Sequence, residues 1–181
     1  IIHPVPHPLR MRLSVIVITH NESANLRACL SSVAFADETI VVDSGSTDDT
    51  VAIARDCGAQ VLQTPDWPGF GAQKNRALAL ATGDWVLSID ADERVTQVLA
   101  ARIRTVVAQD EADAYEIPRL TRFCGQWIHH CGWTPDYVLR LFRRGRARFS
   151  DDLVHERVLL EGARPRRLDT PLLHESYPTP S

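Results

Sequence analysis

The first 110 residues alternate between short apolar runs and segments with helical periodicity. The sharpest apolar run is Leu13–Ile18, whose β-branched residues suit a strand that is buried on both faces. Similar runs occupy residues 38–42, 61–62 and 85–89, and helical patterns occupy residues 22–33, 48–57, 71–82 and 97–108. Because strands that alternate with helices pair in parallel through right-handed crossovers, this order predicts an α/β fold around a parallel sheet.

The alternation of strand and helix patterns ends after residue 110. Short strand patterns lie at residues 114–118, 137–142, 157–160 and 168–173, and no low-complexity linker separates them from the first part. A length of 181 residues also fits one domain. We therefore expect residues 11–181 to form a single domain whose architecture changes near residue 110.

The two ends of the chain differ from the rest. Met11 is the only methionine and directly precedes the first strand pattern, so we interpret residues 1–10 as an expression or upstream remnant. The chain stops at Pro178–Ser181, where we expect a truncation.

Charge is distributed unevenly along the chain, although the formal net charge is only -3. Residues 119–167 carry eleven arginines and five acidic residues, whereas the first 118 residues are acidic. A basic face of this kind can meet phosphorylated substrates or lipid headgroups. Nucleic acid is not an expected partner, because no nucleic-acid-binding module is recognisable and the whole chain is acidic.

The sequence also bears on the compartment. No apolar run approaches the roughly 18–20 residues that a membrane-spanning helix needs. The four cysteines come without a dense disulfide framework or a secretory signal, which favours a reducing cytosol. We expect a cytoplasmic protein, with peripheral contact to the inner face of the cytoplasmic membrane as an open alternative.

Polar clusters follow three of the predicted strands. They are Thr19–Glu22, Asp43–Asp48 and Asp90–Glu93. Ligands of α/β sheets bind outside the carboxyl ends of parallel strands, so we expect these clusters to meet there. Acidic groups brought together would repel one another unless a cation or the donor groups of a ligand lay between them.

Two of these clusters, and one later helix start, each have a structural alternative. Asp90 and Asp92 can hold a hard divalent cation such as Mg²⁺, or they can form a polar turn before the next helix. Asp43 can accept hydrogen bonds from a base or ribose, or it can close an Asx turn while Asp48 caps a helix. The segment Gly71–Arg76 can bind phosphate or sugar hydroxyls at a helix start, or it can be a solvated basic face.

Four motifs in this order carry a resemblance to a known family. Ser14–Glu22, Val41–Asp48, Gly71–Ala77 and Ser88–Glu93 together resemble family 2 glycosyltransferases, and the resemblance covers residues 12–176. The later motifs are similar to lipopolysaccharide core-biosynthesis glycosyltransferases of the β-glucosyltransferase type: Arg119–Phe123, Trp127, Trp133, Leu139–Arg144 and Val154–Glu156.

This resemblance implies a fold and an activity. The fold would be the GT-A, or nucleotide-diphospho-sugar transferase, fold, with a mostly parallel central sheet flanked by helices and a mixed acceptor-side part. Residues 11–110 would bind the nucleotide sugar, and residues 111–181 would hold the acceptor and catalytic part. The activity would be inverting transfer of glucose from UDP-glucose to a lipid-linked lipopolysaccharide core acceptor.

The resemblance also implies residue roles. The nucleotide sugar would contact Thr19, Asn21, Glu22, Asp43, Lys74, Asn75, Asp90 and Ala91. A divalent metal, Mg²⁺ or Mn²⁺, would be held by Asp92 and His174. His20 stands where the family often has Tyr or Phe, so base stacking at this position departs from the pattern.

Inverting transfer needs a base on the acceptor hydroxyl, and this role falls to Glu156, with Asp152 as the second candidate. The alternative for Glu156 is an ion pair with Arg157 or Arg143. Sugar rings commonly lie against aromatic faces, so the loop with Trp127 and Trp133 is expected to contact the acceptor. Cys124 and Cys131 match no common zinc spacing, and a disulfide between them stays open.

Two other functions remain open at this point. The same fold can act on a polyprenyl-phosphate or another glycan acceptor, or it can bind nucleotide sugars without turnover.

Overall fold

A computed structural model of the chain describes residues 10–123, 125–128, 136–152 and 155–176. The helices are α1 (Leu26–Ser32), α2 (Thr50–Asp56), α3 (Phe70–Leu80) and α4 (Gln97–Gln109). The strands are β1 (Leu13–Thr19), β2 (Glu38–Asp43), β3 (Gln60–Gln63), β4 (Trp85–Ser88), β5 (Glu93–Arg94), β6 (Ala114–Phe123), β7 (Gln126–Trp127), β8 (Asp136–Arg143), β9 (Ala147–Phe149), β10 (Val158–Leu160), β11 (Arg166–Arg167) and β12 (Leu172–Ser176).

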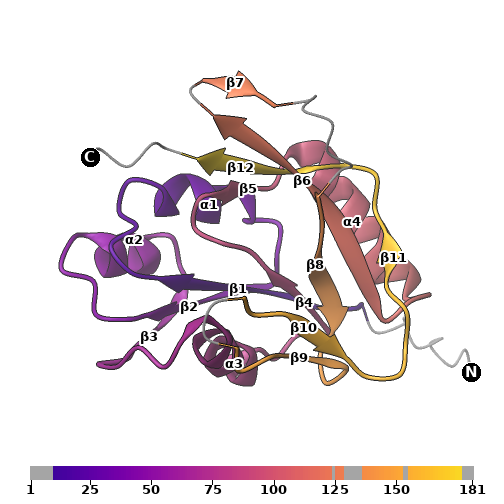
Figure 1. The fold of residues 1–181 in the computed structure, drawn as a ribbon, viewed down its shortest axis with the longest axis horizontal. Coiled ribbons are helices and arrows are strands. Elements are labelled where there is room, and N and C mark those ends of the chain that lie inside the picture. Colours follow the sequence, from indigo (N-terminus) through magenta and orange to yellow (C-terminus); the bar gives the residue numbers. More distant parts are fainter. Residues whose placement is uncertain (1–9, 124, 129–135, 153–154, 177–181) are drawn as a thin grey trace, which may run out of the picture.

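One half of the central sheet is parallel. Its strands lie in the order β3-β2-β1-β4, and all three pairings are parallel. The chain fills the sheet outward from β1 in one direction and then returns to place β4 on the other side (Figure 1). The strand order therefore reverses between β1 and β4, which is where open α/β sheets bind their ligands.

The other half of the sheet is mixed. β8 is antiparallel to β4 and to β6, β12 is parallel to β6, and β5 is antiparallel to β12. The sheet therefore continues across the division predicted near residue 110, because Trp85–Leu87 of β4 pair with Leu141–Arg143 of β8. The predicted fold class, a mostly parallel sheet with a mixed second part, is confirmed.

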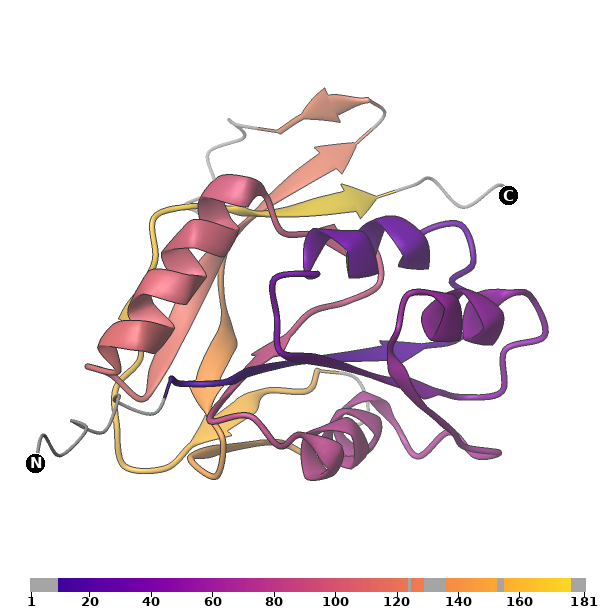
Figure 2. The same ribbon diagram turned by 180° about the vertical axis from the view of Figure 1, so that it is seen from behind.

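Two apolar cores lie on opposite faces of this sheet. Side chains alternate between the faces of a strand, and in β1 Leu13, Val15 and Val17 face α1, α2 and α4, whereas Ile16 faces α3. The hairpin of β9 and β10 covers the α3 side together with that helix (Figures 1 and 2). Burial of both faces explains why the strands read as continuous apolar runs rather than as alternating patterns.

Several predicted boundaries differ from the structure, among them the end of the strand predicted at 114–118, which extends to Phe123 as β6. The first helix begins at Leu26 rather than at residue 22, because Asn21 takes a φ of 52° and a turn precedes the helix. The strand predicted at 168–173 is instead β12, starting at Leu172, preceded by the short β11. Pro171 explains the break, since it has no N–H to donate to a strand ladder. In the described part of the chain, no helix has the length and apolarity to cross a bilayer.

Candidate active site

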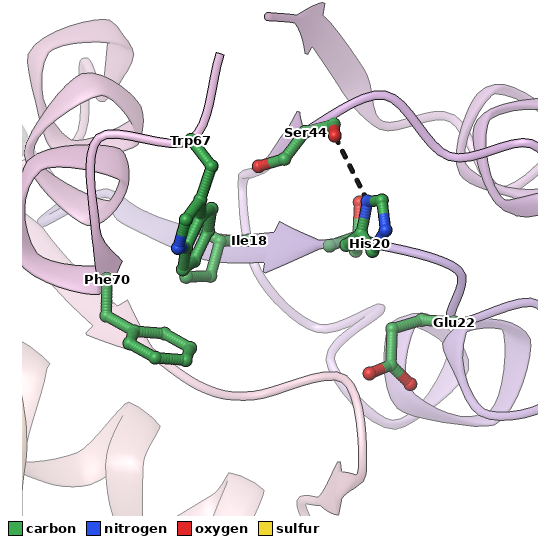
Figure 3. Close-up of a pocket in the computed structure, with 7 residues that line it drawn as sticks. Ile18, His20, Glu22, Ser44, Trp67 and Phe70 are labelled. Atoms are coloured by element: carbon green, nitrogen blue, oxygen red, sulfur yellow. Dashed lines mark hydrogen bonds between the residues drawn. The ribbon is translucent and has the colours of Figure 1, made fainter. Parts of the chain in front are cut away.

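A pocket of about 520 Å³ opens at the carboxyl ends of β1 and β2, beside the point where the strand order reverses. Figure 3 shows its lining: Ile18, Thr19, His20, Glu22, Ser44, Trp67 and Phe70. These residues come from the end of β1, the end of β2, the loop between β3 and α3, and the first residue of α3. This is the edge of the sheet at which the polar clusters were predicted to meet.

The pocket has one aromatic wall and one polar wall. Trp67 and Phe70 meet edge to face with their ring centroids 4.8 Å apart, and both stay almost half exposed. On the other side, the Nδ1 of His20 lies 3.1 Å from the carbonyl oxygen of Ser44 and donates to it, since a carbonyl only accepts (Figure 3). An apolar wall with a few placed polar groups suits a planar ring that has polar edges.

Asp43 builds the loop beside the pocket. Its fully buried carboxylate accepts hydrogen bonds from Thr19 Oγ1 at 2.8 Å, Ser46 N at 2.8 Å and Gly45 N at 3.1 Å. These donors match the Asx-turn alternative and account for the burial of the charge. The following residue, Ser44, lines the pocket instead. A nucleotide contact by Asp43 stays a prediction.

Asn21 and Glu22 have different surroundings. The Oδ1 of Asn21 accepts from Thr47 N at 2.8 Å, so this exposed side chain ties the loops after β1 and β2 together. Glu22 lines the pocket, and its pKa is raised by burial and by the negative charges of Asp92, Asp48 and Asp90. The pocket therefore adjoins the acidic turn that follows β4.

Within that turn, Asp90 is neutralised by the protein itself. One carboxylate oxygen lies 3.2 Å from Lys74 Nζ and the other 3.0 Å from Arg140 Nη2. Burial alone would raise the pKa of Asp90, but the charges of Arg140 and Lys74 outweigh it and hold the pKa well below its usual range. Arg140 also binds the fully buried Glu93 at 2.7 Å. The carbonyl of Ala91 accepts from Arg94 at 2.8 Å and closes the turn.

Asp92 contacts His174 rather than these cations. Its Oδ2 lies 3.1 Å from Nε2 of His174, which β12 brings beside the turn. This hydrogen bond raises the pKa of His174. The side chain of Asp92 is 36% exposed, so it is open to a ligand.

Asp92 and His174 fit a divalent cation that takes its remaining ligands from a substrate. In the described ranges, no three His, Cys, Asp or Glu side chains surround a common point, so the protein offers no complete cage. Mg²⁺ usually needs only one or two protein carboxylates when phosphates complete its shell. The donor set, one open carboxylate with an adjacent imidazole, is compatible with that arrangement.

Glu156 contacts Lys74 rather than the arginines considered as alternatives. Its Oε1 lies 2.7 Å from Lys74 Nζ. Arg157 pairs instead with Asp152, which is exposed and also accepts from Ser150 Oγ at 2.9 Å. Lys74 thus joins the turn after β4 to the segment before β10.

Asn75 contacts the end of β9. Its Nδ2 donates to the Phe149 carbonyl at 3.0 Å, and its Oδ1 accepts from Phe149 N at 2.9 Å. Both ends of the amide are therefore used inside the protein. The predicted contacts of Lys74 and Asn75 with a nucleotide sugar stay predictions.

Trp127 lies on the β6–β7 hairpin, which projects from the sheet beside β12 (Figures 1 and 2). The guanidinium of Arg122 lies over its ring at 5.6 Å from the centroid. Ile128 N donates to the carbonyl of Thr121, and Thr121 Oγ1 lies 3.3 Å from Nδ1 of His174. The hairpin is thus connected to the metal-ligand candidate. Trp133, Cys124 and Cys131 lie outside the described residues.

The sequence model described as glycosyl transferase family 2 matches residues 14–155, which is most of the chain. The chain belongs to glycosyl transferase family 2.

Family 2 relatives include a protein of lipopolysaccharide core biosynthesis. The glycosyltransferase LpsC of Rhizobium meliloti is 34% identical over 164 residues, which cover 84% of this chain and 59% of LpsC. An uncharacterized glycosyltransferase of Rickettsia prowazekii is 44% identical over 146 residues, covering 78% of this chain and 50% of the relative. The chain thus spans about half the length of the relatives it matches. The predicted similarity to core-biosynthesis glycosyltransferases is confirmed.

Solved glycosyltransferases share the fold. Residues 1–349 of S. aureus TarS, in complex with UDP-GlcNAc, superpose with a TM-score of 0.69 at 20% identity, covering 94% of this chain and 60% of that one. Glucosyl-3-phosphoglycerate synthase from Mycobacterium tuberculosis, with Mn²⁺, UDP and glucosyl-3-phosphoglycerate, gives a TM-score of 0.51 at 30% identity over 62% of this chain and 44% of that one.

Some residues of the candidate site were not predicted from the sequence. Arg140 is the main one, because it neutralises both Asp90 and Glu93. Its position between Leu139 and Leu141 in a strand pattern was a signal, since an arginine on a buried strand needs carboxylate partners. Trp67 and Phe70 were not predicted because one lies in a loop and the other is the first residue of α3, so the two form no periodic pattern.

The arginine-rich segment does not form one basic face. Seven of its eleven arginines pair with carboxylates: Arg119, Arg122, Arg140, Arg143, Arg157, Arg166 and Arg167. The other four are exposed, and within the described ranges none has a carboxylate partner: Arg164 lies between β10 and β11, and Arg144, Arg146 and Arg148 lie around the turn from β8 into β9. Because β8 runs antiparallel to β4, this turn lies at the sheet edge opposite the site.

Proposed function

We propose that this chain is the catalytic part of an inverting glycosyltransferase that moves glucose from UDP-glucose to a lipopolysaccharide core acceptor. The observation that carries the proposal is the position of Glu22. It lines the pocket, and hydrogen bonds through Asn25 and Arg94 connect it to the carbonyl of Ala91 in the acidic turn. A ligand with a planar base in the pocket would therefore extend its next groups toward the acidic turn, as a nucleotide sugar does.

The pocket would hold the uracil base. Trp67 and Phe70 offer an apolar wall, and His20 and Ser44 offer polar groups across from it (Figure 3). Structural neighbours support the choice of nucleotide, because TarS is described in complex with UDP-GlcNAc and glucosyl-3-phosphoglycerate synthase in complex with UDP-glucose and Mn²⁺.

The diphosphate would lie at the turn after β4. Asp92 and His174 would hold a divalent cation there, and Lys74 and Arg140 keep the neighbouring Asp90 neutralised. When bound, such a cation supplies positive charge that stabilises the leaving diphosphate.

Glu156 would be the base. Its carboxylate takes the proton from the acceptor hydroxyl while the acceptor oxygen forms a bond to the anomeric carbon. The bond from that carbon to the diphosphate oxygen breaks, and UDP leaves with the electron pair. Attack from the face opposite the leaving group inverts the configuration at the anomeric carbon.

The acceptor is proposed from LpsC and from the hairpin. LpsC is described as a lipopolysaccharide core biosynthesis glycosyltransferase, which supports a core sugar as the acceptor. Trp127 would contact it, because the hairpin that carries Trp127 is connected to His174 through Thr121. Trp133 stays a predicted second contact.

Asp92→Ala is expected to abolish the metal dependence of UDP binding. Because Asp92 is the open carboxylate of the turn, we expect the Kd of UDP in the presence of Mn²⁺ to rise by at least about tenfold. The measurement is isothermal titration of UDP and UDP-glucose, with and without Mn²⁺ or Mg²⁺.

Asp56→Ala is the matched control for this experiment. Asp56 is an exposed residue that pairs with Arg27 on the surface, so the same change there should leave UDP binding as it was. Metal-dependent UDP binding that survives Asp92→Ala would contradict the assigned metal site. Absence of UDP binding with every metal would contradict UDP as the nucleotide, and ADP, GDP and CMP sugars would be tested next.

Exposed arginines at the sheet edge opposite the site also predict contact with membranes. We propose that Arg144, Arg146 and Arg148 supply it, since they are exposed and free of carboxylates in the described ranges. Each basic residue near an anionic surface contributes about 1 kcal/mol at moderate salt. Vesicles containing phosphatidylglycerol should therefore sediment with the protein at low salt, and replacing the three arginines by Gln should release it. Binding that is absent at low salt, or indifferent to added salt, would contradict this contact.

A further inference from the structure

Three consecutive residues of α3 each bind a different part of the site. Gln73 is fully buried, and its Nε2 donates to Ser44 Oγ at 2.8 Å, in the loop that lines the pocket. Lys74 contacts Asp90 in the turn after β4 and Glu156 before β10. Asn75 holds the backbone of Phe149 with two hydrogen bonds. One helix therefore connects the pocket, the acidic turn and the segment that carries the proposed base.

Ser150 and Glu156 lie directly on this helix, against Gly71. A Cβ built on Gly71 would lie 1.8 Å from the carbonyl oxygen of Ser150, a distance that only glycine allows. Ser150 also pairs with Arg157, because its N–H donates to the carbonyl of Arg157 and its Oγ accepts from Arg157 N at 2.9 Å. Glu156 is therefore held close to α3 from both sides of its segment.

Lys74 orients the side chain of Glu156 through an ion pair. The lysine is only 3% exposed, and a buried ammonium group requires charged partners. Asp90 has a second cation in Arg140, whereas Lys74 is the one charged group recorded within 4 Å of Glu156 among the described residues. Removal of Lys74 would leave Asp90 paired but would leave Glu156 free to turn toward solvent.

We propose that Lys74 is a positioning residue for the base Glu156 rather than a ligand of the nucleotide sugar. The proposal rests on the proposed function, in which Glu156 takes the acceptor proton. Lys74 fixes the direction of the carboxylate, and the docking of the segment on Gly71 and Asn75 fixes its place. A base displaced by about 1 Å can lose about 100-fold in rate, because proton transfer depends on orientation.

A double-mutant cycle tests this role. The variants are Lys74→Met, Glu156→Gln and both together, with Lys74→Arg as the conservative replacement and Arg27→Met as a surface control. Three quantities are measured for each: the Kd of UDP with Mn²⁺, the rate of UDP release from UDP-glucose, and the melting temperature. Water can serve as the acceptor for UDP release, so the test needs no knowledge of the natural acceptor.

We expect Lys74→Met to lower the rate of UDP release by about 100-fold while the Kd of UDP stays the same. Lys74→Arg should restore much of the rate, because its guanidinium can reach the same carboxylates. In the Glu156→Gln background, Lys74→Met should have no further effect on the rate, since the residue through which it acts is already gone. A purely structural lysine would lower the rate equally in both backgrounds.

Two results would overturn the positioning role alone. One is a Kd of UDP that rises at least about tenfold in Lys74→Met, which would mean that Lys74 binds the nucleotide sugar directly. The other is an undiminished effect of Lys74→Met in the Glu156→Gln background. If Glu156→Gln itself keeps the full rate, or if the unaltered chain neither binds UDP nor releases it from UDP-glucose, the proposed function fails and the positioning role falls with it.

Discussion

Arg140→Met is expected to lower the free energy of unfolding by about 3–5 kcal/mol, the range typical of removing one partner from a buried ion pair. The side chain of Arg140 is 8% exposed, and it binds Asp90 at 3.0 Å and Glu93 at 2.7 Å. Glu93 has no exposed surface. Methionine fills a similar volume but leaves the buried Glu93 carboxylate without its cation, and that desolvated charge is the source of the loss.

The same change should disturb the site. Arg140 lies on β8, and its two partners flank the turn that presents Asp92, so the ion pairs tie this turn to the sheet. We expect Arg140→Met to weaken UDP binding as well as stability. Urea unfolding followed by circular dichroism measures the loss of stability at a temperature where the variant is folded. Calorimetric titration of UDP at that temperature measures the loss of binding.

Arg166→Met is the matched control. It removes an arginine from an exposed pair with Glu111, at 3.7 Å, and such pairs contribute at most about 1 kcal/mol. A loss of stability for Arg140→Met no larger than that of Arg166→Met would mean that water reaches Glu93 and that the ion pairs do not hold the turn.

Glu156→Gln is expected to reduce the rate of sugar transfer by about 100- to 10,000-fold, the usual contribution of a general base. The amide keeps the shape of the side chain and can still lie beside Lys74, but it cannot take the proton of the acceptor hydroxyl. UDP binding should be unaffected, because Glu156 does not line the pocket. Initial rates of UDP release and calorimetric titration of UDP separate the two effects.

Asp152→Asn distinguishes the two base candidates. Asp152 is exposed and contacts Ser150 Oγ and Arg157, without a contact to Lys74. We expect this variant to keep most of the rate. If Asp152→Asn removes the activity and Glu156→Gln does not, the base has been assigned to the wrong carboxylate.

Local sequence patterns predict the central strands, the binding edge and the family of this protein. The β-branched run of β1 and the apolar run of β4 identify two central strands, because a strand that is buried on both faces must be apolar along its length. The polar residues after these runs identify the binding edge, since the direction of a parallel strand puts its carboxyl end there. The motifs after β1, β2 and β4 and in α3 also identified the family, which the match over residues 14–155 confirms.

The sequence could not assign the individual charges. Asp90 and Asp92 look equivalent in an Asp-Ala-Asp turn. In the folded protein, however, Asp90 pairs with Lys74 and Arg140. Asp92 remains accessible beside His174. The partners lie 16 to 82 residues away along the chain, and no local periodicity encodes which of them a carboxylate will meet.

The positions of the central strands and the site edge follow from the period of apolar residues and the chemistry of strand ends, which are local properties. The tertiary structure alone decided that Ser44 rather than Asp43 faces the pocket, that Lys74 joins Asp90 to Glu156, and that Arg140 is buried between two carboxylates. Burial is the physical reason, because a charge removed from water must take whichever partner the packing of distant segments brings within reach.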